Sequence, residues 1–156
     1  MRDESDAYKI VEQRLNLEFE QNNLPFKNKV VFIPPLSRTG FNTLMNLSRV
    51  LLDPIYFSGI NTSIQALGCG LPIVTLQGKF MRSRAASGML KRIHMDQLIA
   101  NSQEMYINNV QRLVTDNVYY QSVKTTIKNN VHLLYKDTAP IRSLENFFKK
   151  ITSKDC

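Results

Sequence analysis

Long hydrophobic runs are missing from this sequence of 156 residues. No apolar stretch approaches the roughly 20 residues that a membrane-spanning helix needs. The first ten residues, MRDESDAYKI, also lack the basic start, the apolar stretch and the small-residue cleavage site of a secretory signal peptide. We therefore expect a protein that neither crosses nor binds a membrane.

Cysteine and histidine are scarce, with two residues of each. Cys69 lies in an apolar segment and Cys156 is the last residue, so the pair fits neither a metal pattern nor a disulfide. His94 and His132 are isolated, which favours a structural or solvent role over catalysis. There is no Asp-X-Asp pair to bind a metal. We expect no metal, no cofactor and a reducing, cytoplasmic location.

Acidic residues are absent from one stretch of a chain whose net charge is +7. Residues 79–92 hold five basic side chains and no acidic one. Such a block indicates an anionic partner, although a solvated helix face explains the charge equally well. The tyrosines and lysines of residues 119–136 lack the regular aromatic and basic alternation of a nucleic-acid surface. We expect an amphipathic helix there and no nucleic-acid partner.

Short continuous apolar runs alternate with segments of helical spacing. Three runs predict buried strands at residues 30–33, 50–52 and 71–76. Helical spacing predicts a helix over residues 7–21, short helices after Thr39 and Asn61, four or five helices after residue 81 with the last near Pro140, and no further strand. Strands of this kind separated by helices are typical of a parallel sheet flanked by helices. The sequence therefore predicts one α/β domain over residues 1–156 with a helical C-terminal tail.

One loop follows the second predicted strand, at the edge where parallel sheets bind ligands. Residues 58–63 read Ser-Gly-Ile-Asn-Thr-Ser and lead into a helix. Gly59 permits a tight turn, and Asn61, Thr62 or Ser63 can cap the helix. Free N–H groups at a helix start attract anions, although a plain capping sequence looks the same. The loop lacks the Gly-Lys-Ser/Thr of a P-loop.

A second loop follows the third predicted strand, at residues 77–87. Gly78 provides the turn, and Lys79, Arg82 and Arg84 supply positive charge. Both loops lie at the same sheet edge, so a hydroxyl-rich and an arginine-rich loop are expected to converge on one anion. Together they predict a phosphate-binding site.

The order of these segments resembles that in the C-terminal catalytic half of the O-GlcNAc transferase and SPINDLY-like family. Bacterial members, including the cytoplasmic protein N-glucosyltransferases, look most similar, and the resemblance runs from about residue 7 to about residue 151. The segments that carry it are Leu-Leu-Asp-Pro at 51–54, Gly-Ile-Asn-Thr-Ser at 59–63, Ala-Leu-Gly-Cys-Gly-Leu-Pro-Ile-Val-Thr at 66–75, Gly78, and Arg-Ser-Arg at 82–84.

The resemblance implies an inverting GT-B glycosyltransferase built from two facing Rossmann-like domains. This chain would be its UDP-sugar-binding half, without the first strand and without the N-terminal domain that holds the protein acceptor. The implied reaction transfers GlcNAc or a hexose from UDP-sugar to that acceptor, while this chain alone carries no catalytic residue and is expected to be inactive. The alternative is a non-catalytic nucleotide-binding or interaction remnant of such an enzyme.

The resemblance and the basic loop together assign nine residues to UDP binding. Leu36 would offer backbone groups to uracil, while Arg38 and Phe41 stand where the family has a lysine and a base-stacking histidine. Gln65 replaces an acid that holds the ribose, which should weaken that hydrogen bond because the charge is lost. The full set is Leu36, Arg38, Phe41, Asn61, Thr62, Ser63, Gln65, Arg82 and Arg84.

Overall fold

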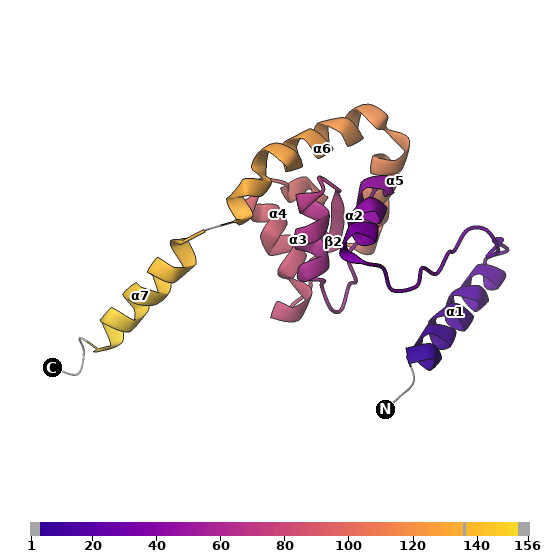
Figure 1. Ribbon diagram of the computed structural model, residues 1–156, viewed down its shortest axis with the longest axis horizontal. Helices are drawn as coiled ribbons and strands as arrows, with labels where there is room; N and C mark the ends of the chain where they lie inside the picture. Colours follow the sequence, from indigo (N-terminus) through magenta and orange to yellow (C-terminus); the bar gives the residue numbers. More distant parts are fainter. Residues whose placement is uncertain (1–3, 136, 153–156) are drawn as a thin grey trace. The chain divides into compact units, whose positions relative to one another are not determined.

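The computed structural model describes residues 4–135 and 137–152 (Figure 1). The chain divides after Leu36 into two units, each described here by itself. The expectation of one domain over residues 1–156 stays a prediction. No helix in the described residues is long and apolar enough to cross a membrane.

The first unit consists of helix α1, Glu4–Gln21, and a segment that turns back after it. The helix predicted for residues 7–21 is confirmed. Phe26 places its ring edge against Phe19, with centroids 5.4 Å apart, and Phe32 packs in the same way on Tyr8 at 4.5 Å. These two aromatic pairs hold the segment against its own helix.

The strand predicted for residues 30–33 is wrong. These residues have no strand assignment, and Val31 is 75% exposed. A β-branched run favours extended backbone, but a strand also needs a neighbouring strand to receive its hydrogen bonds. No strand pairs with this run in the described chain. Phe32 instead packs on α1.

The second unit is built on a parallel sheet of three strands in the order β1-β2-β3. The register places Leu51 opposite Ile73 and Thr75 opposite Ile99. The strands are β1, Leu51–Leu52; β2, Ile73–Leu76; and β3, Ile99–Ala100. The predicted strands at 50–52 and 71–76 are confirmed, whereas the expectation of no strand after residue 81 is wrong because of β3. The fold class is confirmed as α/β.

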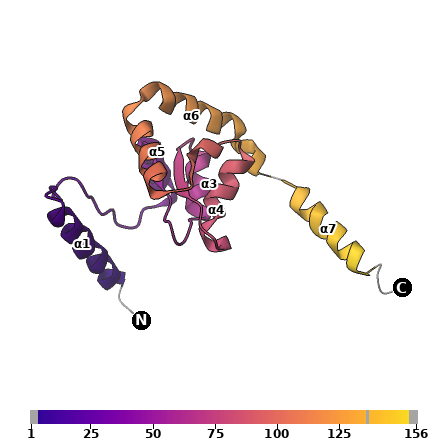
Figure 2. The same cartoon turned by 180° about the vertical axis from the view of Figure 1, so that it is seen from behind.

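Helices flank this sheet, with α3 and α4 on one side of β2 and α5 on the other (Figures 1 and 2). Short 3₁₀ turns lie between several of the elements. The helices are α2, Arg38–Leu47; α3, Asn61–Gly68; α4, Ala85–Arg92; α5, Gln103–Thr115; α6, Asn117–Asn130; and α7, Ala139–Thr152. The 3₁₀ turns are η1, Met81–Ser83; η2, Asp96–Leu98; and η3, Val131–Leu134.

The core lies around β2, whose residues Ile73, Val74 and Thr75 are fully buried. Burial of consecutive residues is expected where helices cover both faces of a parallel sheet. The final helix, predicted from its apolar stripe, is confirmed as α7, but no residue of α7 is buried. The sheet and its strand-end loops therefore rest on a core that α7 does not enter.

Candidate functional site

The two strand-end loops meet, as predicted. The Ser58 N–H donates to the carbonyl of Arg82 at 2.8 Å. The Ser58 hydroxyl oxygen accepts from the N–H of Ala86, in the first turn of α4, at 2.9 Å. Ser58 is 1% exposed, so water does not compete for these bonds. One buried serine thus joins the loop after β1 to the loop after β2.

Asp53 closes the first loop on itself. Its Oδ1 accepts from the Gly59 N–H at 3.0 Å, and its Oδ2 accepts from the Thr75 hydroxyl on β2 at 2.7 Å. The main-chain carbonyl of Asp53 accepts from the Tyr106 hydroxyl of α5 at 3.2 Å. Burial raises the pKa of Tyr106, and the charge of Asp53 raises it further, so the hydroxyl keeps the proton that it donates.

Gly78 closes the second loop. Its N–H donates to the carbonyl of Ser83 at 3.4 Å. A Cβ at this position would lie 2.9 Å from the Ser83 Cβ, closer than side chains approach. The tight turn predicted at Gly78 therefore requires glycine for close packing.

Helix α3 begins without a side-chain cap. The N-cap position is Ile60, and the first helical bond runs from the Ile64 N–H to the Ile60 carbonyl at 3.1 Å. The predicted capping role of Asn61, Thr62 or Ser63 is therefore wrong. Because these three residues form the first turn, their backbone N–H groups have no partner within the described chain.

Ser63 carries an unusual hydroxyl in this first turn. The side chain is fully buried, yet its Oγ has no hydrogen-bond partner among the described residues. A Cβ on Gly59 would lie 3.8 Å from this oxygen and 3.5 Å from the Cβ of Thr62. Gly59 therefore lies directly beside the two hydroxyl-bearing residues, at ordinary contact distance. A buried hydroxyl without a partner costs about 1–3 kcal/mol, which a bound acceptor would offset.

A pocket of about 480 Å³ lies where the loops meet. Arg82 and Arg84 line it, are exposed, and have no acidic partner within the described residues. The guanidinium of Arg82 lies 4.6 Å from the ring centre of Phe80. The other lining residues are Phe57, Ser58, Ile60, Met81, Ala85 and Gly88. This pocket combines positive charge with the open start of α3.

The sequence matches glycosyl transferase family 41 over residues 9–136. The chain belongs to this family. The sequence-based resemblance is therefore confirmed.

Two plant relatives carry the name probable UDP-N-acetylglucosamine–peptide N-acetylglucosaminyltransferase SPINDLY. The protein of Oryza sativa subsp. japonica is 25% identical over 111 residues, which cover 71% of this chain and 11% of that protein. The protein of Solanum lycopersicum is 21% identical over 116 residues, which cover 73% of this chain and 12% of that protein. The family 41 chain thus spans a small part of these relatives.

A solved structure is similar over nearly the whole chain. It is a mutant O-GlcNAc transferase of Thermobaculum terrenum, with a TM-score of 0.77 and 26% sequence identity. The match covers 90% of this chain and 27% of that one. The α/β fold of this family 41 chain is thus that of part of an O-GlcNAc transferase.

Arg82 and Arg84 are in the lining of the pocket where the loops meet, and Asn61, Thr62 and Ser63 follow the lining residue Ile60 without being in the lining themselves. The other four predicted residues belong to α2, to α3 and to the first unit. Arg38 is the exposed first residue of α2, and Gln65 is exposed on α3. Phe41 is partly buried against the core, so only part of its ring is available to a base. Leu36 is the last residue of the first unit and is 42% exposed. UDP binding by these four residues, as by the other five, stays a prediction.

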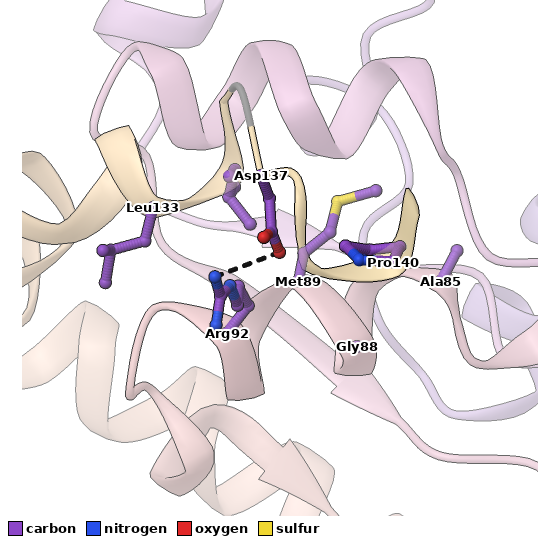
Figure 3. A pocket seen from close by; sticks show the side chains of 8 residues that line it. Ala85, Gly88, Met89, Arg92, Leu133, Asp137 and Pro140 are labelled. Atoms are coloured by element: carbon purple, nitrogen blue, oxygen red, sulfur yellow. Dashed lines mark ion pairs between the residues drawn. The ribbon is translucent and has the colours of Figure 1, made fainter. Parts of the chain in front are cut away.

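A larger pocket of about 560 Å³ lies on α4 and contains none of the nine predicted residues (Figure 3). Arg92 and Asp137 form an ion pair of 3.0 Å at its rim. Asp137 also accepts from the Ala139 N–H at 3.0 Å, at the start of α7. Its lining is Ala85, Gly88, Met89, Arg92, Leu133, Leu134, Asp137 and Pro140. The larger pocket is therefore not the one that holds the predicted phosphate-binding arginines.

Asp53 and Tyr106 hold the loop before α3, but they are not among the nine residues that the sequence assigns to the site. The position of Asp53 could have indicated its role, because an acidic residue directly after a strand and six residues before Gly59 can close the loop between them. Tyr106 lies 53 residues further on, and no local pattern links it to the loop. Within the described residues no cluster of three or more His, Cys, Asp or Glu could hold a metal ion.

Proposed function

We propose that this chain binds the diphosphate of a UDP-sugar at the N-terminus of α3, as part of a glycosyltransferase that modifies a protein acceptor. The observation that carries the proposal is the buried, unpartnered Ser63 hydroxyl beside Gly59 and three free N–H groups. Several donors without acceptors suit a ligand that brings oxygen atoms and negative charge.

The basic loop supports the same ligand. Arg82 and Arg84 face a pocket shared with Ile60, the residue directly before α3. Negative charge grows on the departing UDP when its bond to the sugar breaks, and fixed donors and cations stabilise that charge. The printed names of the plant relatives favour UDP-N-acetylglucosamine as donor and a peptide as acceptor.

The first test compares UDP with uridine by titration calorimetry on the full chain. Hydrogen bonds to charged groups contribute about 1.5–3 kcal/mol each, so UDP should bind at least about tenfold more tightly than uridine. Equal affinities for UDP and uridine would contradict the proposed diphosphate site.

Two substitutions localise the binding. Thr62→Ala should weaken UDP binding by about 1–2 kcal/mol with the fold retained, because it removes a hydroxyl donor to a charged group. Ser63→Ala should weaken UDP binding without lowering the stability of the free chain, because its hydroxyl has no partner to lose. Thr125→Ala, at an exposed position on α6, is the matched control. Loss of the fold in Thr62→Ala would assign that side chain a structural role.

The second candidate is a non-catalytic nucleotide-binding or interaction remnant. It is favoured by the small share of the relatives' length that this chain spans. Both candidates predict UDP binding. They differ when this chain replaces the corresponding part of an active family 41 enzyme, because the first candidate predicts sugar transfer by the hybrid and the second predicts none.

A further inference from the structure

Asp53 is a buried carboxylate that has no cationic partner. It is 3% exposed, and no ion pair joins it to a basic side chain in the described part of the chain. Burying a carboxylate is costly, and hydrogen bonds must replace the lost water. Both carboxylate oxygens accept such bonds, from the Gly59 N–H and from the Thr75 hydroxyl. These two hydrogen bonds offset the cost of burying the carboxylate and hold it in one orientation.

The bonds of Asp53 fix both ends of one loop. The loop leaves the sheet at Asp53 itself and returns to its carboxylate at Gly59, two residues before the first turn of α3. Thr75 ties the same carboxylate to the central strand β2. The direction of the free N–H groups of residues 61–63 therefore depends on this carboxylate.

We propose that Asp53 is a positioning residue for diphosphate binding, which acts through Gly59 without touching the ligand. This inference rests on the proposed function. The carboxylate holds the loop so that the donors at the start of α3 keep a fixed direction beside Gly59. Binding then needs no reordering of the loop, and such preorganisation increases affinity.

The negative charge of Asp53 should lower the affinity for an anion, whereas its positioning of the loop should raise that affinity. A carboxylate close to a diphosphate repels it, most strongly where water is excluded. Removing the charge would therefore tighten UDP binding if repulsion dominated, and would weaken it if positioning dominated. The two effects differ in sign, so one substitution separates them.

The test is Asp53→Asn in the full chain. The amide retains the size of the side chain and one acceptor oxygen, but it loses the charge assistance of both hydrogen bonds. We expect the Kd for UDP to rise about tenfold and the Kd for uridine to change by less than about twofold. A loss of folded protein would instead weaken both ligands equally. An unchanged or tighter Kd for UDP would overturn the proposal.

A second variant keeps the charge. Thr75→Val removes the hydroxyl that donates to the carboxylate and leaves Asp53 negative. Positioning predicts weaker UDP binding and unchanged uridine binding, whereas unchanged UDP binding would contradict it. This variant also decides the matter if Asp53→Asn does not fold.

Asp96→Asn is the control for charge alone. Asp96 is exposed on η2, before β3, so it lies toward the opposite end of the sheet from the loops. Its loss should leave the ratio of UDP to uridine affinity unchanged. If the unsubstituted chain shows no preference for UDP over uridine, the proposed function fails; if that preference exists and both Asp53→Asn and Thr75→Val retain it, only the positioning role fails.

Discussion

Single buried polar side chains connect the strand ends to the loops. Ser58, Asp53 and Thr75 are each at most 3% exposed. The side chain of Asp53 accepts from the main-chain N–H of Gly59, and that of Ser58 accepts from the N–H of Ala86, 28 residues later. A backbone group that loses such a partner inside the protein costs more than the bond itself contributed. Substitution at these positions should therefore change loop geometry as well as stability.

Tyr106 offers a test of this network at high pH. Its hydroxyl donates to the Asp53 carbonyl, and burial together with the charge of Asp53 raises its pKa above the ordinary value of 10.0. The folded protein therefore holds this proton to higher pH than the unfolded chain does. The stabilisation is complete below about pH 10 and is lost as the pH rises through the raised value.

We expect Tyr106→Phe to lower the free energy of unfolding by about 0.5–1.5 kcal/mol at pH 7, the net value of one hydrogen bond. Its stability should then fall less steeply above pH 10 than that of the unsubstituted chain. Urea unfolding between pH 7 and 10.5 measures both. Some slope should remain, because burial also raises the pKa of Tyr119. A parallel loss of stability in both proteins would rule out a role for the Tyr106 proton.

At the scale of the elements, Ser58 links the loop after β1 to helix α4. Its hydroxyl oxygen caps α4 from another segment of the chain, because it accepts from the Ala86 N–H in the first turn of that helix. We expect Ser58→Ala to lower the free energy of unfolding by about 0.5–2 kcal/mol, as for other lost caps. UDP should bind more weakly as well, since the start of α4, directly after Arg84, loses its hydrogen bond to the loop before α3, and the backbone bond from Ser58 to Arg82 remains as the link between the loops.

Ser102→Ala is the matched control for a lost cap. Ser102 caps α5 by accepting from the Met105 N–H at 3.1 Å and does not line the pocket. Urea unfolding should show a similar loss of stability in both variants, and calorimetry should show weaker UDP binding in Ser58→Ala alone. Equal UDP binding in the two would mean that the bond of the Ser58 hydroxyl to α4 does not contribute to UDP binding.

The sequence could predict the two strands that lie in continuous apolar runs between helices. The runs at 50–52 and 71–76 lie between helices and form β1 and β2. The run at 30–33 has the same β-branched character but no partner strand in the described chain, since its pairing depends on residues far away. Strand β3 has two residues, Ile99 and Ala100, too few for a period-two pattern to stand out.

The candidate site could be predicted in part for a similar reason. That the two loops converge followed from the direction of parallel strands, and the Ser58 bonds confirm it. The cap of α3 could not be predicted, because a Ser, Thr or Asn at a helix start can face either its own backbone or open space. Asp53 faces the loop instead of solvent because Thr75, 22 residues later, offers it a donor.

At the scale of the whole molecule, two properties concern the proposed function: the net charge and the share of the similar transferase that the chain covers. The net charge is +7, and the basic block of residues 79–92 borders the pocket through Arg82 and Arg84. An anionic ligand would therefore be attracted over a distance that shrinks as salt is added. The chain covers 27% of the length of the similar O-GlcNAc transferase chain.

We expect the isolated chain to have no measurable transferase activity while it still binds UDP-sugar. Transfer needs an acceptor held in line with the sugar and a group to take its proton, and positioning alone can lower a barrier by about 7–11 kcal/mol in favourable cases. The hydroxyls and arginines of the proposed site suit the departing UDP, and the sequence assigns no residue of this chain to the acceptor. Binding and turnover should therefore separate.

Incubation of the purified chain with labelled UDP-GlcNAc or UDP-glucose and a peptide library measures turnover, and calorimetry on the same sample measures binding. Ser63→Ala is the control for binding, since a signal that survives it does not come from the start of α3. Labelled peptide above the level without protein would contradict the expectation. A rate that rises with the square of the protein concentration would then show that two copies of the chain complete one site, because each copy would supply the acceptor groups that the other lacks.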